Sequence, residues 1–202
     1  QERFRYMAGV FTRQRAAGGR TLVGGGYAEA AWNRPDFSLV AGARLDGWRA
    51  YDGVRRERDT ATGALTVDAP PANASGATPT GRIGLRWRLA GETWARAAAY
   101  AGFRPPTLNE LHRPFRVGND ITEANAALKP ETLYGVETGL SGAGAVTWNL
   151  GVFYNQVRDP ITNVTIGIGP GTFPIAGFIP AGGVLRQRPN TGPIYASGLA
   201  AE

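Results

Sequence analysis

The sequence predicts an all-β protein, an antiparallel transmembrane β-barrel segment of about eight strands. Several segments alternate apolar and polar residues with a period of two, the pattern of a strand whose two faces meet different surroundings. The connections between these segments alternate between short and long, as they do in transmembrane barrels. Nowhere does the sequence reach about 18 uninterrupted apolar residues, so it offers no membrane-spanning helix.

The clearest predicted strand covers residues 80–89. Its side chains divide into two sets on opposite faces: Ile83, Leu85, Trp87 and Leu89 against Arg82, Gly84, Arg86 and Arg88. Residues 37–48 and 145–157 alternate in the same way. Five further strands are predicted where Ala and Gly blur the contrast, at 3–13, 20–32, 92–103, 131–140 and 188–202. We expect the apolar faces to meet lipid and the polar faces to line the interior.

The predicted connections fix the direction of the strands. Short links are expected at 33–36, 90–91 and 141–143, and long ones at 49–78, 104–130 and 158–187. Transmembrane barrels keep short turns on the periplasmic side, so the strands that precede the long loops run outward. A further link at 15–19 would then be a short external loop. The Gly-Pro-rich stretch 167–183 is interpreted as loop because strands of similar character flank it.

The connection after the fifth predicted strand has a distinctive sequence. Between Gly102 and Glu131 the chain reads GFRPPTLNELHRPFRVGNDITEANAALKPE. Pro105-Pro106 ends one strand, and Pro130 stands where the next begins, a position that a sheet accepts. This run resembles a stretch of TonB-dependent receptors, in which FR-x-PTLNELYRPF follows one strand and LKPE opens the next. Residues 187–202, QRPNTGPIYASGLAAE, resemble the family's strand that ends in a GVEAE-like run.

The resemblance implies that residues 1–202 are part of the barrel domain of a TonB-dependent receptor, a barrel of about 22 strands. Gln1 is not a start residue and no signal-peptide zones follow it, so we expect a fragment without its plug domain and C-terminal strands. The implied location is the cell outer membrane. The implied partners are the plug domain of the same chain, the TonB complex through the N-terminal region, membrane lipid and a small-molecule ligand.

Composition and motifs argue against several other functions. The net charge of +6 comes almost wholly from Arg, which we ascribe to codon usage, so no nucleic-acid partner is expected. The single histidine, His112, lies in a loop with no Ser or Cys motif nearby. Calcium loops, His-x-x-x-His spacings and phosphate-binding glycine loops do not occur, and there is no Cys. We therefore expect no catalytic residues, no metal site and no cofactor.

Two groups of residues are candidates for ligand contact. Residues of an external loop face arriving substrate, and this predicts a site built from Arg104, His112, Arg113, Arg116, Asn119 and Asp120. Guanidinium groups lining the lumen could hold a carboxylate, a phosphate or an anionic chelate, which points to Arg44, Arg82, Arg86 and Arg88, with Arg3, Arg5 and Arg13 near the start. Two alternatives stand beside these. Lumen charges also pair with one another or with a plug, and the PTLNEL segment could be scaffolding.

These observations lead to one functional hypothesis and two rivals. The hypothesis is an outer-membrane receptor that binds a scarce ligand, a ferric siderophore or similar anionic chelate, and imports it with TonB-coupled energy. A passive porin would share strands, loops and a charged lumen, and a plug-encoding region upstream of Gln1 would decide between the two. A soluble β-sandwich binding module is the second rival, and it should extract without detergent.

Overall fold

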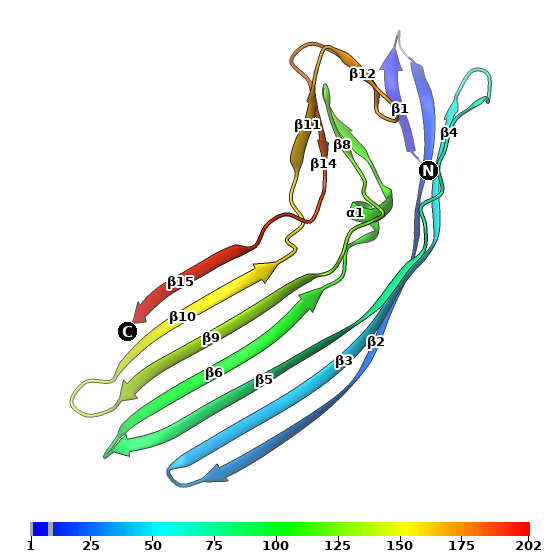
Figure 1. Ribbon diagram of the computed structural model, residues 1–202. Helices are drawn as coiled ribbons and strands as arrows, with labels where there is room; N and C mark the ends of the chain where they lie inside the picture. The colour runs from blue at the N-terminus through cyan, green and yellow to red at the C-terminus, as the bar shows by residue number, and fades with distance from the viewer. Residues whose placement is uncertain (1, 8–9) are drawn as a thin grey trace.

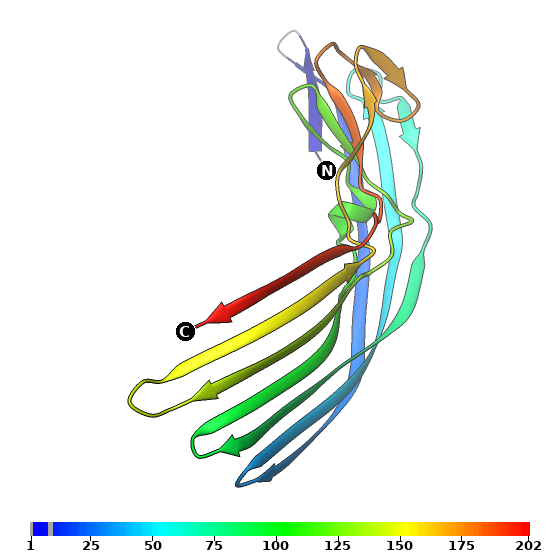
Figure 2. The ribbon, with the colours of Figure 1, turned by 60° about the vertical axis from the view of Figure 1, so that its left-hand side comes forward.

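The computed structural model describes residues 2–7 and 10–202. Among these residues, nine strands form one antiparallel sheet that curves like part of a barrel wall (Figures 1 and 2). Eight of the nine follow one another across the sheet: β1 (Glu2–Met7), β2 (Val10–Arg34), β3 (Phe37–Asp59), β5 (Ala74–Ala90), β6 (Thr93–Arg104), β9 (Glu131–Gly142), β10 (Trp148–Arg158) and β15 (Ile194–Ala201). The ninth, β4 (Leu65–Asp68), pairs with the outer part of β3. The all-β antiparallel prediction is confirmed.

The turns at one end of the sheet are short, whereas the connections that join β6 to β9 and β10 to β15 at the other end are long (Figure 1). The tight turns are Pro35-Asp36, Gly91-Glu92 and residues 143–147. Gly91 has φ +53°, a backbone conformation that costs a glycine little. In the described part of the chain no helix is long and apolar enough to cross a membrane.

The first part of the sheet differs from the prediction. The expected loop at 15–19 does not form, because β2 runs through it without a break. The chain instead makes a β-bulge, where the register with β3 shifts between Gly18 and Arg20, and Asp52 on β3 adopts φ +53°. Glycines permit a bulge as readily as a turn, which is why the sequence was misread here. Of the expected strand 3–13, residues 8–9 lie outside the described residues.

The predicted loop at 49–78 is also largely strand. β3 continues to Asp59, and β5 already begins at Ala74. This outer part carries charge on many positions, and cross-strand ion pairs compensate it: Arg13 with Asp59 at 2.7 Å and Arg15 with Glu57 at 2.8 Å. Strands that stand in water need no apolar face, so hydrophobic alternation did not reveal them.

Strand register separates two faces of the sheet. Leu39, Leu85 and Ala97 lie opposite one another on β3, β5 and β6, and Leu45 and Ile83 on the same face are exposed. Ser38, Arg86 and Arg96 form the neighbouring row, whose side chains point to the opposite side. We call the side of Arg86 the inner face. An exposed apolar face opposite a polar one is the arrangement of a barrel wall in lipid.

The two remaining long connections pack against each other. The first contains α1 (Leu108–His112), β7 (Phe115–Val117) and β8 (Asp120–Glu123), and the second contains β11 (Val164–Ile168), β12 (Gly171–Phe173), β13 (Gly177–Ile179) and β14 (Val184–Gln187). Strands β8 and β14 pair in parallel within a four-stranded sheet of order β11-β14-β8-β7. Ile121 of β8, Ile179 of β13 and Leu185 of β14 form a buried apolar cluster. We call this unit the loop assembly.

The loop assembly rests on the inner face of the main sheet. Ala50 shares that face with Arg44 on β3, and it is buried against Leu111 and Leu128 of the first loop. Arg55 on β3 donates from Nη2 to the Glu123 carboxylate at 2.6 Å, with both side chains about nine-tenths buried. The inner face is therefore the one that the long loops fold over, which fits a lumen rather than a lipid surface.

Opposite effects are expected for charge changes on the two faces. Leu85→Arg in the full-length protein should destabilise the barrel by about 2–4 kcal/mol near the bilayer midplane, because it places a charge in hydrocarbon. Arg86→Leu, one residue away on the inner face, should leave membrane insertion nearly intact. Folding stability in lipid bilayers measures both. Equal costs for the two substitutions would contradict the assignment of faces.

The Arg55–Glu123 pair is expected to hold the loop assembly in place. Glu123→Gln should make local opening of residues 113–129 easier by about 1.5–3 kcal/mol, because it weakens a buried hydrogen bond between charged groups. Limited proteolysis of the full-length protein, with cleavage sites mapped by mass spectrometry, measures that opening. Asp68→Asn is the matched control, since it breaks the exposed Arg56–Asp68 pair and should change little. Equal protection of the loop in both variants would argue against this role.

Candidate functional site

The PTLNEL segment forms a short capped helix at the base of the first loop. Thr107 is the N-cap of α1, and its hydroxyl accepts from Glu110 N. The Glu110 carboxylate accepts in return from Thr107 N at 2.7 Å, which completes a capping box. This reciprocal pair satisfies backbone donors that a five-residue helix would otherwise leave unpaired. The local structure favours the scaffold interpretation of these residues.

Arg104 fixes this helix to the sheet. Its Nε donates to Glu131 at 2.6 Å and its Nη1 donates to Glu110 at 2.9 Å. Glu131 Oε1 also accepts from Ile161 N, so the same carboxylate reaches the second loop. Burial opposes the charged form of Glu110, but hydrogen bonds from Arg104 and Thr107 outweigh it and hold the pKa of Glu110 below its usual range. Arg104 is thus engaged at the root of both loops.

His112 lies inside the structure rather than on its outer surface. Its side chain is almost fully buried, and neither ring nitrogen has a hydrogen-bond partner among the described residues. Burial lowers the pKa of His112, so the imidazole is neutral. The ring packs against the bulge of β2, where a Cβ on Gly19 would come within 2.8 Å of its Cδ2 atom. In this structure His112 does not face an arriving ligand.

Of the remaining predicted loop residues, one forms bonds within the loop assembly and three are exposed. Asp120 accepts from Arg186 at 2.8 Å and from Val184 N at 3.1 Å, and these bonds lower its pKa and join β8 to β14. Arg113, Arg116 and Asn119 are exposed. Partial burial lowers the pKa of Arg116, and the positive charges of Arg5 and Arg15 lower it further.

Three of the four predicted lumen arginines have carboxylate partners. Arg44 pairs with Asp46, Arg82 pairs with Glu29 at 2.6 Å, and Arg88 pairs with Asp36 at 3.1 Å. Arg86 differs, because its guanidinium stacks over the ring of Trp94 at 3.9 Å. Ion pairs within the wall therefore compensate three of these arginines, whereas Arg86 contacts an aromatic ring instead.

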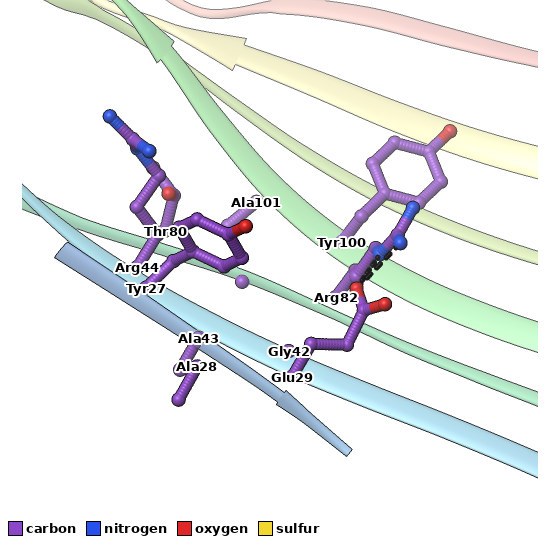
Figure 3. A pocket seen from close by; sticks show the side chains of 11 residues that line it. Tyr27, Ala28, Glu29, Gly42, Ala43, Arg44, Thr80, Arg82, Tyr100 and Ala101 are labelled. Carbon is purple, nitrogen blue, oxygen red and sulfur yellow. Dashed lines mark hydrogen bonds and ion pairs between the residues drawn. The ribbon is translucent and has the colours of Figure 1, made fainter. Parts of the chain in front are cut away.

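The inner face also contains a shallow depression of about 420 Å³ (Figure 3). Tyr27 and Arg44 lie at one end, and Arg82 with Tyr100 lies at the other. The Glu29–Arg82 pair reaches across Gly42 of β3, where a Cβ would come within 3.3 Å of the Glu29 carboxylate. Guanidinium groups beside phenol rings suit a planar or anionic group.

Sequence reasoning missed the contribution of β2 and β6 to this depression. Tyr27 and Glu29 alternate with Ala28 in β2, which is a usable signal, but the surrounding Gly and Ala conceal it. Tyr100 stands in an alanine-rich strand, and its hydroxyl contacts Asn155 Oδ1 at 3.0 Å across Gly135. Among the residues described, no cluster of His, Asp or Glu could hold a metal ion.

Solved structures of three transporters or receptors are similar to this chain. The FrpB iron transporter from Neisseria meningitidis (F5-1 variant) is 17% identical with a TM-score of 0.54, over 90% of this chain and 23% of that one. A double mutant of the Serratia marcescens hemophore receptor HasR, in complex with its hemophore HasA and heme, is 16% identical with a TM-score of 0.67, over 90% and 31%. The copper transporter OprC is 21% identical with a TM-score of 0.62, over 91% and 26%.

These similarities concern the fold and cover less than a third of each solved protein. A search of curated protein sequences finds no match. A sequence model of the family described as TonB dependent receptor-like, beta-barrel matches residues 4–200, almost the whole chain. The curved antiparallel sheet, its exposed apolar face and its long connections agree with that match. The chain therefore belongs to the TonB-dependent receptor-like β-barrel family.

Proposed function

We propose that this chain is part of an outer-membrane receptor that captures a scarce ligand outside the cell and imports it with energy delivered by TonB. Barrels of this family are outer-membrane proteins, which supports the same location for this chain. The similar solved proteins are named as an iron transporter, a hemophore receptor and a copper transporter. A lumen-filling plug domain of the same protein and the TonB complex are the proposed partners.

The proposed ligand is a ferric siderophore or a similar anionic chelate. One observation carries this choice: every carboxylate between Arg104 and Glu131 is engaged by an arginine, whereas loop arginines remain exposed. Glu110 and Glu131 accept from Arg104, Asp120 accepts from Arg186, and Glu123 accepts from Arg55. Arg113 and Arg116 are exposed on the same loop. The surface that meets solvent is therefore basic, and it would attract an anion.

The residues of the loop then have separate roles. Arg104, the capped helix and the Arg55–Glu123 pair hold the loop in one conformation over the inner face. Arg116 and Asn119 present donors that would contact the ligand. A preorganised loop loses less conformational entropy when ligand binds, which favours affinity. The energised release step depends on the plug and on TonB.

The two rival functions make different demands. A passive porin fits the same strands and loops, and the presence of a plug-encoding region upstream of Gln1 separates it from a receptor. A soluble β-sandwich would cover one sheet face with a second sheet. Here the apolar face that carries Ile83 and Leu150 is exposed, which favours lipid as its neighbour. Enzyme activity has the least support, since the similar proteins are named as transporters and receptors.

Exposed loop arginines are expected to contribute to ligand capture. In the full-length receptor, Arg113→Ala combined with Arg116→Ala should weaken binding of an anionic ferric chelate by about 1.5–3 kcal/mol per lost charge-assisted hydrogen bond. Binding of the labelled chelate to cells that display equal amounts of receptor measures the effect. Arg34→Ala is the control, because this exposed arginine lies beside the short turn at Pro35. Unchanged affinity in the double variant would reduce this loop to scaffolding.

A further inference from the structure

Two arginines face each other on the inner face without a carboxylate partner. Arg86 on β5 and Arg96 on β6 are opposite one another in the strand register, and both are exposed. Like charges in directly opposed positions destabilise a strand pair. Their neighbours Arg82 and Arg88 each form an ion pair. In the described part of the chain, no carboxylate lies within ion-pair distance of Arg86 or Arg96.

Both guanidinium groups are positioned by contacts that leave their charge uncompensated. Arg86 Cζ lies 3.9 Å from the ring centroid of Trp94, which holds it by a cation–π contact. Arg96 extends over two glycines of the adjacent strands. A Cβ on Gly139 would come within 3.0 Å of its Nε, and a Cβ on Gly151 within 3.3 Å of its Nη2. The arginines are thus placed side by side, with donors available toward the lumen.

The surroundings indicate what kind of group fits this pair. Glu137 lies one row nearer the external end on the same face, and it is exposed without forming an ion pair with Arg96. The inner face also exposes aromatic rings, with Tyr27 76% exposed and Phe153 37% exposed. A wall that met only water would gain nothing from exposed aromatic rings. A polypeptide segment with apolar and acidic side chains would cover both the rings and the charges.

We propose that Arg86 and Arg96 together bind a carboxylate side chain on the segment of this protein that fills the lumen. This inference rests on the proposed function, which supplies a plug domain as that segment. The pair lies toward the short turn at Gly91-Glu92, at the end of the sheet opposite the loop assembly (Figure 1). A ligand from outside reaches the loop assembly first, and the pair lies far from it. An acidic side chain of the plug, which fills the lumen at this depth, is therefore the proposed partner of the pair. Two guanidinium groups can hold one carboxylate with several charge-assisted hydrogen bonds.

Site-directed crosslinking in the full-length protein tests the contact. Arg96→Lys and, separately, Arg86→Lys each introduce a primary amine at the pair. A water-soluble carbodiimide activates a nearby carboxylate, the amine displaces the resulting urea, and an amide bond remains. Lys129 is the only native lysine of residues 1–202, so mass spectrometry can assign the new link. We expect a link from the introduced amine to an Asp or Glu outside these residues.

A matched variant shows whether the chemistry works on this face. Arg82→Lys places an amine beside Glu29, which pairs with Arg82 at 2.6 Å. This variant should give a link between position 82 on β5 and Glu29 on β2. If that link forms while neither variant at the pair reaches a residue outside 1–202, the proposal is overturned. A link from the pair to Glu137 alone would overturn it as well, because the pair would then be neutralised within the wall.

A second measurement separates this inference from the proposed function. Arg86→Gln combined with Arg96→Gln should raise the rate of proteolysis of the lumen-filling segment by about tenfold, as expected for one lost charge-assisted hydrogen bond. An unchanged rate counts against the proposal. In parallel, uptake of a ferric chelate is measured in cells that express the wild-type receptor. Normal uptake without crosslink refutes only the carboxylate contact, whereas a crosslink without uptake refutes only the proposed ligand and transport.

Discussion

Backbone hydrogen bonding inside a membrane is the constraint on which the rest of this structure depends. In hydrocarbon, each backbone N–H and C=O must be paired within the protein, and an antiparallel sheet with tight turns does this strand by strand. The order β2, β3, β5, β6, β9, β10 and β15 follows the chain because each strand pairs with the next. Side chains then divide between an exposed apolar face and a polar inner face. On the inner face, some of the charges are compensated within the wall, as when Arg82 pairs with Glu29 and Arg88 pairs with Asp36.

Beyond the membrane this constraint is relaxed, and the chain uses different interactions. The outer parts of β2 and β3 continue the same ladder but replace the apolar face with charged side chains. Pairs such as Arg15–Glu57 are largely buried there, because the loop assembly covers them. Arg15 also donates to the Pro114 carbonyl at 2.8 Å, so an ion pair of the strands directly positions the first loop. The strand extension is therefore the base against which the first loop packs.

The sequence revealed the features that depend on neighbours along the chain and hid those that depend on distant ones. Alternation at 80–89 placed Leu85 and Arg86 on opposite faces, and tight turns were predicted where Gly91 and Pro35 stand. The bulge of β2 was misread, because its glycines suit a turn equally well. The parallel pairing of β8 with β14 joins residues about 60 positions apart, and no local pattern indicates it. For the candidate site, residue type could not separate the buried His112 from the exposed loop arginines.

The distribution of charge connects these levels. The chain has 22 basic and 16 acidic residues, so carboxylates are the limiting partner. The structure uses many of them to fix geometry: Glu110 and Glu131 at the root of the loops, Glu123 beneath the loop assembly and Asp120 between its strands. Among the described residues, two of the places where positive charge has no carboxylate partner are Arg116 on the first loop and the Arg86 and Arg96 pair on the inner face. The first place meets the external medium and the second meets the lumen, so one excess of arginine can serve two recognition tasks.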